Sequence, residues 1–112
     1  MKFALLVLCC FPVTAQSADD FTALGVRSCG DWNRYARQPQ SRVVLGNWIL
    51  GFVSAAAMSY SRTEGYDLLK RANPERLIGF MDEYCRLNPT MTNLDGAQAI
   101  YFLLKRDSGT FN

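Results

Sequence analysis

Two cysteines that lie beyond an apolar leader place the strongest constraint on the fold of this chain. The chain has four cysteines in all; Cys9 and Cys10 fall within the leader, which leaves Cys29 and Cys85 as the pair that follows it. An even cysteine count in a small exported domain is typical of a disulfide framework, because oxidising compartments let the bond form and persist. The sequence therefore predicts one disulfide, Cys29–Cys85, in an exported protein.

The leader has the three parts of a cleavable secretory signal. Lys2 provides a positive start, residues 3–13 form an apolar run, and Val13-Thr14-Ala15 offers a small-residue cleavage site. Residues 1–15 are thus predicted to be a cleavable signal peptide, with cleavage as late as residue 18. About eleven apolar residues are too few to span a bilayer as a helix. We expect the mature protein in the periplasm, secreted through the inner membrane.

A lipoprotein signal is the alternative interpretation of the leader. Leu6-Val7-Leu8-Cys9 loosely resembles a lipidation box. The bulky Leu8 stands where a small residue is wanted, and the apolar run before Cys9 is short, so a plain cleaved signal is favoured.

The composition excludes several classes of function. The chain has no histidine, which rules out Ser-His-Asp and Cys-His catalytic groups and zinc sites built on histidine. Its 12 basic and 10 acidic residues give a net charge of +2, which falls to about +1 when Lys2 leaves with the signal. The basic residues form no stripe and do not alternate with aromatic ones, so nucleic acid is not an expected partner. We also expect no metal and no other cofactor.

Apolar residues recur at helical spacing through the mature chain, and period-two alternation is rare. A first helix is predicted over Phe21–Ala36, with a break near Ser28-Cys29-Gly30. A second is predicted over about Val43–Ser61, after a proline-containing joint at Gln38–Ser41. This second helix is the most apolar, so it should be central and contacted on several sides. Its polar and glycine interruptions argue against a membrane span in the mature chain.

Three further segments complete the helical pattern. Thr63–Ala72 is predicted to be a short helix or turn. Asn73-Pro74-Glu75 is a strong helix start, because Asn can cap, Pro fits the first position and Glu suits the positive end of the dipole. That helix should stop at Asn88-Pro89, and the last helix should cover about Asn93–Arg106. Residues 107–112 are predicted to be a frayed tail.

The predicted fold is all-α: a small single-domain helical bundle of four to five helices over residues 19–106. The Cys29–Cys85 bond would tie the first helix to the penultimate one. For a loop of about 57 residues, the lost chain entropy of the unfolded state is equivalent to on the order of 4 kcal/mol. Because a domain this small is only marginally stable, such a bond could decide whether it stays folded outside the cytoplasm.

The order of landmarks along the chain is more specific than any single motif. Ser28-Cys29-Gly30-Asp31-Trp32 is followed by residues 48–55, then by residues 81–89 and by a last helix within residues 94–104. In this order the landmarks resemble the small periplasmic immunity proteins of type VI secretion, the Rap/Tai type. The resemblance covers nearly all of the mature chain, and its most specific parts are the Tyr-Cys-x-x-Asn-Pro stretch and the Trp-x-x-Gly-Phe helix. It implies a helical domain with one disulfide that binds and blocks a peptidoglycan-degrading toxin.

A protein-binding surface of this kind needs aromatic or arginine anchors near its centre. The candidates are Tyr60, Arg62 and Tyr66 after the central helix, and Arg34 and Arg37 at the end of the first helix. The plainer interpretation gives Tyr66 a place in the core and the arginines a solvated face. The expected partner is a cell-wall hydrolase toxin, and a homodimer is left open.

Two other binding functions are alternatives. An accessory envelope protein of a secretion or conjugation system could use the same kind of domain. An acid-stress chaperone of the HdeA kind is also small, helical, periplasmic and closed by one disulfide, and protonation of the carboxylates would make this chain strongly positive at low pH. However, the chain lacks lysine-rich flanking tails, and its Trp-x-x-Gly-Phe helix does not match that family.

Catalysis is not expected from the acidic residues, so the protein is predicted not to be an enzyme. Asp82 and Glu83 are adjacent. Neighbours on a helix point about 100° apart, so these two do not form a general acid/base pair over one substrate. Their favoured interpretation is solvated charge on the outer face beside Cys85.

Overall fold

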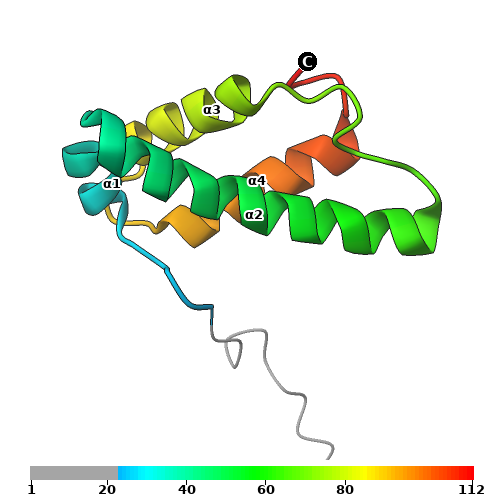
Figure 1. Ribbon diagram of the computed structural model, residues 1–112, viewed down its shortest axis with the longest axis horizontal. Helices are drawn as coiled ribbons and strands as arrows, with labels where there is room; N and C mark the ends of the chain where they lie inside the picture. The colour runs from blue at the N-terminus through cyan, green and yellow to red at the C-terminus, as the bar shows by residue number, and fades with distance from the viewer. Residues whose placement is uncertain (1–22) are drawn as a thin grey trace, which may run out of the picture.

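The computed structural model describes residues 23–112, which form four helices (Figure 1). They are α1 (Cys29–Tyr35), α2 (Pro39–Glu64), α3 (Pro74–Leu87) and α4 (Asn93–Arg106). Over this range there is no strand, only an isolated antiparallel bridge between Ser28 and Thr92. The predicted all-α fold of four to five helices is therefore confirmed, with four. The predicted signal peptide, residues 1–15, lies outside the described part of the chain.

The helices are arranged around α2, the longest of them (Figure 1). α2 packs chiefly against α4, while α1 and α4 both pack against α3. Their facing sides form one core, in which the largest fully buried apolar side chains are Trp32, Ile49, Val53, Met81, Ile100 and Leu104. Burial of each large apolar side chain contributes roughly 1.5–3 kcal/mol.

The predicted disulfide is present and joins α1 to α3. Cys29 and Cys85 are 56 positions apart in the sequence, their Cα atoms are 4.8 Å apart, and neither side chain is exposed. α1 has only seven residues. A helix of that length is not stable in water by itself, so α1 depends on the disulfide and on packing against its neighbours.

α1 begins at Cys29, and the predicted helix is wrong over residues 23–28. The Arg27 N–H donates to Asn93 Oδ1 at 2.8 Å, and the Arg27 carbonyl accepts from the Asn93 N–H at 2.9 Å. These bonds hold the segment extended against the start of α4, and the Ser28 side chain then caps α1. A tertiary contact thus overrides the local helical spacing.

α2 begins at Pro39, earlier than predicted. Gln38 is its extended N-cap, and Pro39 occupies the first helical position, where its missing N–H would have no partner in any case. The helix ends at Glu64 because Gly65 has a left-handed backbone, with φ of 68°. No separate helix forms over Thr63–Ala72, since its first two residues belong to α2 and the others form turns and irregular backbone.

α3 and α4 have the predicted bounds because their starts are encoded locally. The Asn73 side chain caps α3 by accepting from the Glu75 N–H at 2.9 Å. Thr92 and Asp95 form a reciprocal capping box at the start of α4. Each cap satisfies backbone N–H groups that a helix leaves free at its first turn.

The C-terminal tail is ordered against the bundle, so the prediction of a frayed tail over residues 107–112 is wrong. Phe111 is only 3% exposed, and its ring packs edge-to-face on Phe80 with centroids 5.6 Å apart. Its carbonyl accepts from the Asn73 N–H at 2.7 Å. Burial of this large aromatic side chain and its backbone hydrogen bond offset part of the entropy lost in ordering the tail. The helical domain therefore extends to Phe111 and does not stop at residue 106.

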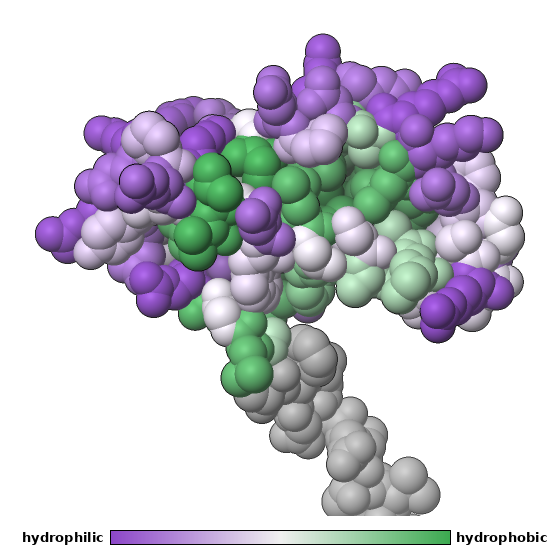
Figure 2. All heavy atoms as spheres, viewed as in Figure 1, coloured by the Kyte–Doolittle hydropathy of each residue, from purple (hydrophilic) through white to green (hydrophobic). Residues whose placement is uncertain are grey.

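α2 leaves one of its sides uncovered by the described residues. It contacts all three other helices, as predicted for a central helix, yet apolar side chains gather over it on the face seen in Figure 2. By length and composition α2 is able to cross a membrane, with a mean hydropathy of 1.5 over its most apolar stretch, of which 28% is buried. The absence of a membrane span in the mature chain stays a prediction.

Candidate functional site

The five residues predicted to bind a partner fall into two groups at opposite ends of α2. Arg34 and Arg37 lie at the end of α1, just before α2 begins, whereas Tyr60, Arg62 and Tyr66 lie at or beyond its last turns. A helix of 26 residues is about 39 Å long. The predicted residues therefore do not form one patch.

Tyr60, Arg62 and Tyr66, which we call the distal group, do not converge on one site. Tyr60 is half-buried against the core, and Arg62 is exposed beside Met58 on the same helix. Tyr66 is 52% exposed, and its hydroxyl lies 3.0 Å from the Ser108 hydroxyl, so its expected place in the core is wrong. Tyr60, Arg62 and Tyr66 line no pocket together among those found over residues 23–112.

The proximal group leads to a pocket between α1 and α3. Arg34 is exposed and lies over the ring of its neighbour Tyr35, whereas Arg37 lines a cavity of about 430 Å³. We call this cavity the arginine pocket. It is lined by Trp32, Asn33, Ala36, Arg37, Arg42, Asp82 and Arg86.

A hydrogen-bonded group of three side chains forms the polar centre of the arginine pocket. Arg42 binds both carboxylate oxygens of Asp82, with Nη1–Oδ1 and Nη2–Oδ2 distances of 2.9 and 2.8 Å. Trp32 Nε1 donates to the same carboxylate at 3.0 Å. Arg42 also donates to the Ala36 carbonyl at the end of α1, at 3.2 Å. One guanidinium therefore connects α1, α2 and α3.

Asp82 thus binds side chains of α1 and α2, which its interpretation as a solvated outer charge does not include, although its side chain is still 44% exposed. Partial burial acts to raise its pKa, but the hydrogen bonds from Arg42 and Trp32 and the charge of Arg42 outweigh burial and hold that pKa below its usual range. The pKa of Arg42 is raised, chiefly by its hydrogen bond to Asp82. Both groups are therefore charged at neutral pH. Glu83 is exposed and pairs with Arg86, as expected for a surface charge.

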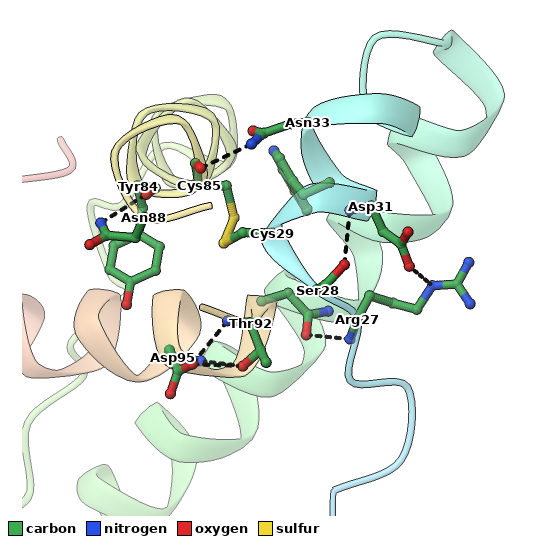
Figure 3. The surroundings of a disulfide bond; sticks show 12 residues. Arg27, Ser28, Cys29, Asp31, Asn33, Tyr84, Cys85, Asn88, Thr92 and Asp95 are labelled. Atoms are coloured by element: carbon green, nitrogen blue, oxygen red, sulfur yellow. Dashed lines mark hydrogen bonds and ion pairs between the residues drawn. A yellow bond between two sulfur atoms is a disulfide. The ribbon is translucent and has the colours of Figure 1, made fainter. Parts of the chain in front are cut away.

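The disulfide lies directly behind the pocket and fastens its two walls together. Figure 3 shows Cys29 of α1 bonded to Cys85 of α3, with the Asn33 side chain directed at the backbone of Cys85. The Asn33 amide donates to the Cys85 carbonyl at 3.0 Å. Because Asn33 itself lines the pocket, the geometry of the wall is set by the same contacts that hold α1 in place.

The arginine pocket carries an excess of positive charge. Three guanidiniums line it against the single carboxylate of Asp82, which Arg42 neutralises. Arg86 pairs with Glu83 outside the pocket. The Arg37 guanidinium has no hydrogen-bond or ion-pair partner among residues 23–112, and it is exposed. The pocket is therefore suited to an anionic group such as a carboxylate, which Arg37 could bind in bidentate geometry.

The described residues contain no cluster of three or more metal-ligating side chains. Asp82 is the one carboxylate that lines the pocket, and it is already bound by Arg42 and Trp32. The chemistry available in the pocket is thus recognition of a charged group. That the protein is not an enzyme stays a prediction.

Comparison of the chain with protein-family models, curated proteins and solved structures finds no match. The resemblance to Rap/Tai immunity proteins therefore rests on the landmark residues alone and stays a hypothesis. Of those landmarks, the disulfide and Trp32 belong to the pocket or lie directly behind it.

Asp82→Asn is expected to lower the free energy of unfolding at neutral pH by about 1–2 kcal/mol, because it weakens charge-assisted hydrogen bonds at a partly exposed site. The folded-state pKa of Asp82 lies below its unfolded value of about 3.9. The carboxylate therefore stabilises the fold above that pH, and its contribution is lost as the pH falls through the folded pKa. The gap between wild type and variant should narrow as the pH falls below the unfolded value and should close once the pH is below the folded pKa.

Urea unfolding followed by circular dichroism at neutral and acid pH measures this gap. Glu83→Gln is the matched control, because Glu83 is the adjacent carboxylate but is exposed and bonded only to Arg86. Its effect should be far smaller at every pH. A gap for Asp82→Asn that persists undiminished in acid would contradict the assigned role of the ion pair.

Proposed function

We propose that this protein is a periplasmic immunity protein that binds and neutralises a peptidoglycan-degrading toxin through the arginine pocket. The observation that carries the proposal is a preorganised cationic pocket whose walls are joined by a buried disulfide. The secretory leader supports the same compartment, because the bond can form and persist there. The resemblance to Rap/Tai proteins supplies the class of partner.

The pocket supports a binding function through the kinds of residue that line it. Tryptophan and arginine are the residue types that most often dominate the energy of protein interfaces, near the centre of a desolvated patch. Here Trp32 and Ala36 are almost fully buried, at 1% and 4% exposed, and hold the wall of the pocket in place. Arg37 is exposed, has no partner among residues 23–112, and is the lining residue that a partner could contact. An acidic side chain or a chain-terminal carboxylate of the toxin would fit this combination.

Rigidity is the second support. Because the disulfide, Asn33 and Arg42 fix both walls before a partner arrives, little conformational entropy remains to be lost on binding. An immunity protein needs high affinity for its toxin, since even slight residual toxin activity is harmful. Nanomolar affinity corresponds to about −12 kcal/mol.

Calorimetry at neutral pH tests the proposal, with an inactive variant of a cell-wall hydrolase found in a neighbouring reading frame as the partner. Arg37→Glu should weaken binding at least about 100-fold, because it places a carboxylate where the partner's anion would lie. Arg106→Glu makes the same charge change on an exposed residue at the end of α4 and should bind normally. Tyr66→Ala examines the distal group and should also bind normally. Equal binding by all three variants would contradict the assignment of the arginine pocket as the binding site.

Protection in cells tests the function itself. Expression with the leader should protect a cell whose periplasm receives that hydrolase, and deletion of residues 1–15 should abolish protection, because a cytoplasmic inhibitor never meets a toxin that acts on peptidoglycan. An acid-stress chaperone would instead bind many unfolded clients near pH 2 and none at neutral pH. Promiscuous binding in acid alone, or a partner that belongs to a secretion or conjugation apparatus, would replace the immunity proposal with one of those alternatives.

A further inference from the structure

The side of α2 that faces away from the bundle is less polar than a solvent-exposed helix face normally is. No charged residue occurs between Arg42 and Arg62. The buried side of the helix is formed by Leu45, Gly46, Ile49, Val53 and Ala57. On the opposite side Val44 is 71% exposed and Met58 is 53% exposed. Exposed helix faces in soluble proteins normally carry charged residues.

We call this opposite side the outer face of α2 and define it by Val44, Asn47, Trp48, Gly51, Ala55 and Met58. These residues follow helical spacing, and their mean direction is opposite to that of the buried side. Gly51 lies at its middle, and a side chain placed there would meet nothing within 4 Å. Leu24, whose carbonyl accepts from Trp48 Nε1 at 2.7 Å, adds an 86% exposed apolar side chain beside it.

Apart from Trp48, whose counterpart Ser54 is not on this face, the residues of the outer face form pairs about Gly51. Val44 and Met58 lie two helical turns away on either side, about 10 Å along the axis. Asn47 and Ala55 lie about one turn away on either side. If two copies of α2 packed antiparallel with Gly51 at the crossing, Val44 of each would meet Met58 of the other. This reciprocity is what a two-fold interface requires of a single surface.

We infer that the outer face of α2 binds a second copy of this chain, in an antiparallel two-fold dimer centred on Gly51. The absence of charge suits self-pairing, because an uncharged face meets its own copy without like-charge repulsion. At the ends of the same pairing, Arg62 meets Gln40 and Glu64 meets Gln38, so no cation is opposed to a cation. Gly51 permits close approach of the two helix backbones.

The position of Gly51 agrees with this inference. Glycine within a helix is about 1 kcal/mol less favourable than alanine. Gly46 lies against Ile78 and Gly96 against Met81, whereas Gly51 on α2 and Gly79 on α3 have open space around them among the described residues. Of these two, Gly51 is the one on the uncharged outer face of α2, where a second helix would fill that space.

The inference goes beyond the proposed function, because it concerns a different surface. Arg42, which forms the polar centre of the arginine pocket, is on the bundle side of α2, opposite to the outer face. A dimer through the outer face would therefore carry two accessible pockets, and each proposal can fail without the other.

Light scattering coupled to size exclusion on the mature chain, residues 16–112, tests the dimer. The wild type should have the mass of two chains at micromolar concentration. Gly51→Glu should be monomeric, with the dissociation constant raised at least about 100-fold, because two carboxylates would face each other in a dry interface. Gly79→Glu is the matched control: Gly79 is also an exposed helical glycine with open space around it, on α3, and its variant should stay dimeric. Thermal melts of both variants should establish that each is folded.

Cysteine cross-linking tests the register. A mixture of Val44→Cys and Met58→Cys chains should form mixed disulfide dimers, whereas either variant alone should cross-link far less. The inference would be overturned if the wild type were monomeric, or if Gly51→Glu left the dimer intact. A wild type that has the mass of one chain in solution and binds phosphatidylcholine vesicles would overturn it as well. A dimer that appears only when residues 16–22 are removed would also overturn it, since that result would show that this segment covers the outer face.

Discussion

Replacement of both Cys29 and Cys85 by alanine is expected to lower the free energy of unfolding by about 4 kcal/mol. The bond closes a long loop, with a sequence separation of 56, and its loss restores that entropy to the unfolded chain. Both sulfur atoms are fully buried, so their removal also leaves the packing between α1 and α3 incomplete. Because a small domain has only about 5–15 kcal/mol in total, the variant should be partly unfolded at physiological temperature.

Thermal melts and urea unfolding of the oxidised wild type, the reduced wild type and the double variant measure this effect. Arg106→Ala is the control for a change at an exposed charge and should leave the melting temperature almost unchanged. In the variant, local stability should fall most in α1, because its seven residues cannot form a helix alone. The amide protons of α1 should therefore exchange first. An unchanged melting temperature would show that the core suffices without the bond.

Trp32→Ala is expected to lower the free energy of unfolding by about 3–5 kcal/mol and to abolish binding of a partner to the arginine pocket. Trp32 is 1% exposed and is the largest of the fully buried side chains. Its indole N–H also donates to Asp82, so the variant removes core volume and a hydrogen bond from the centre of the arginine pocket at once. Few single changes elsewhere in the domain combine both losses.

Two further tryptophan variants separate these contributions. Trp32→Phe keeps most of the ring and removes the N–H donor, so it should cost less and weaken chiefly the acid-sensitive part of stability that Asp82 provides. Trp48→Ala alters the other tryptophan of the chain, which is half-buried and bonded to Leu24, and it should cost clearly less than Trp32→Ala. Equal losses at the two tryptophans would contradict the assignment of Trp32 to the centre of the core.

The sequence predicts those parts of the fold whose signals are local. Asn73 before Pro74 marks the start of α3, and the bounds of α4 follow from the pattern between Asn93 and Arg106. Pro39 is a local signal of the same kind: the sequence predicts it within a joint, whereas it occupies the first position of α2. The extended segment at Arg27 and the ordered tail at Phe111 depend on contacts with distant residues, so no local pattern reveals them.

The arginine pocket could be predicted only in part. The disulfide follows from the cysteine count, and Arg37 was chosen as an anchor because of its residue type. Arg42 and Asp82 are 40 positions apart and belong to no motif, so nothing in the sequence indicates that they meet. Arg42 is the missed functional residue, and its position in the first turn of a proline-started helix is recognisable only once α2 is known to begin at Pro39.

The pairing of Cys29 with Cys85 sets the order in which this chain can mature. If the chain is exported from its amino end, as its leader predicts, Cys29 would cross the membrane early and would have no native partner until Cys85 follows, when most of the chain has been translocated. Before then α1 can pack only against α2, because its other partners in packing and hydrogen bonding belong to α3 and to the start of α4. If cleavage of the predicted signal removes Cys9 and Cys10, one pair of thiols is left, and its first intramolecular oxidation gives the native bond without an isomerase.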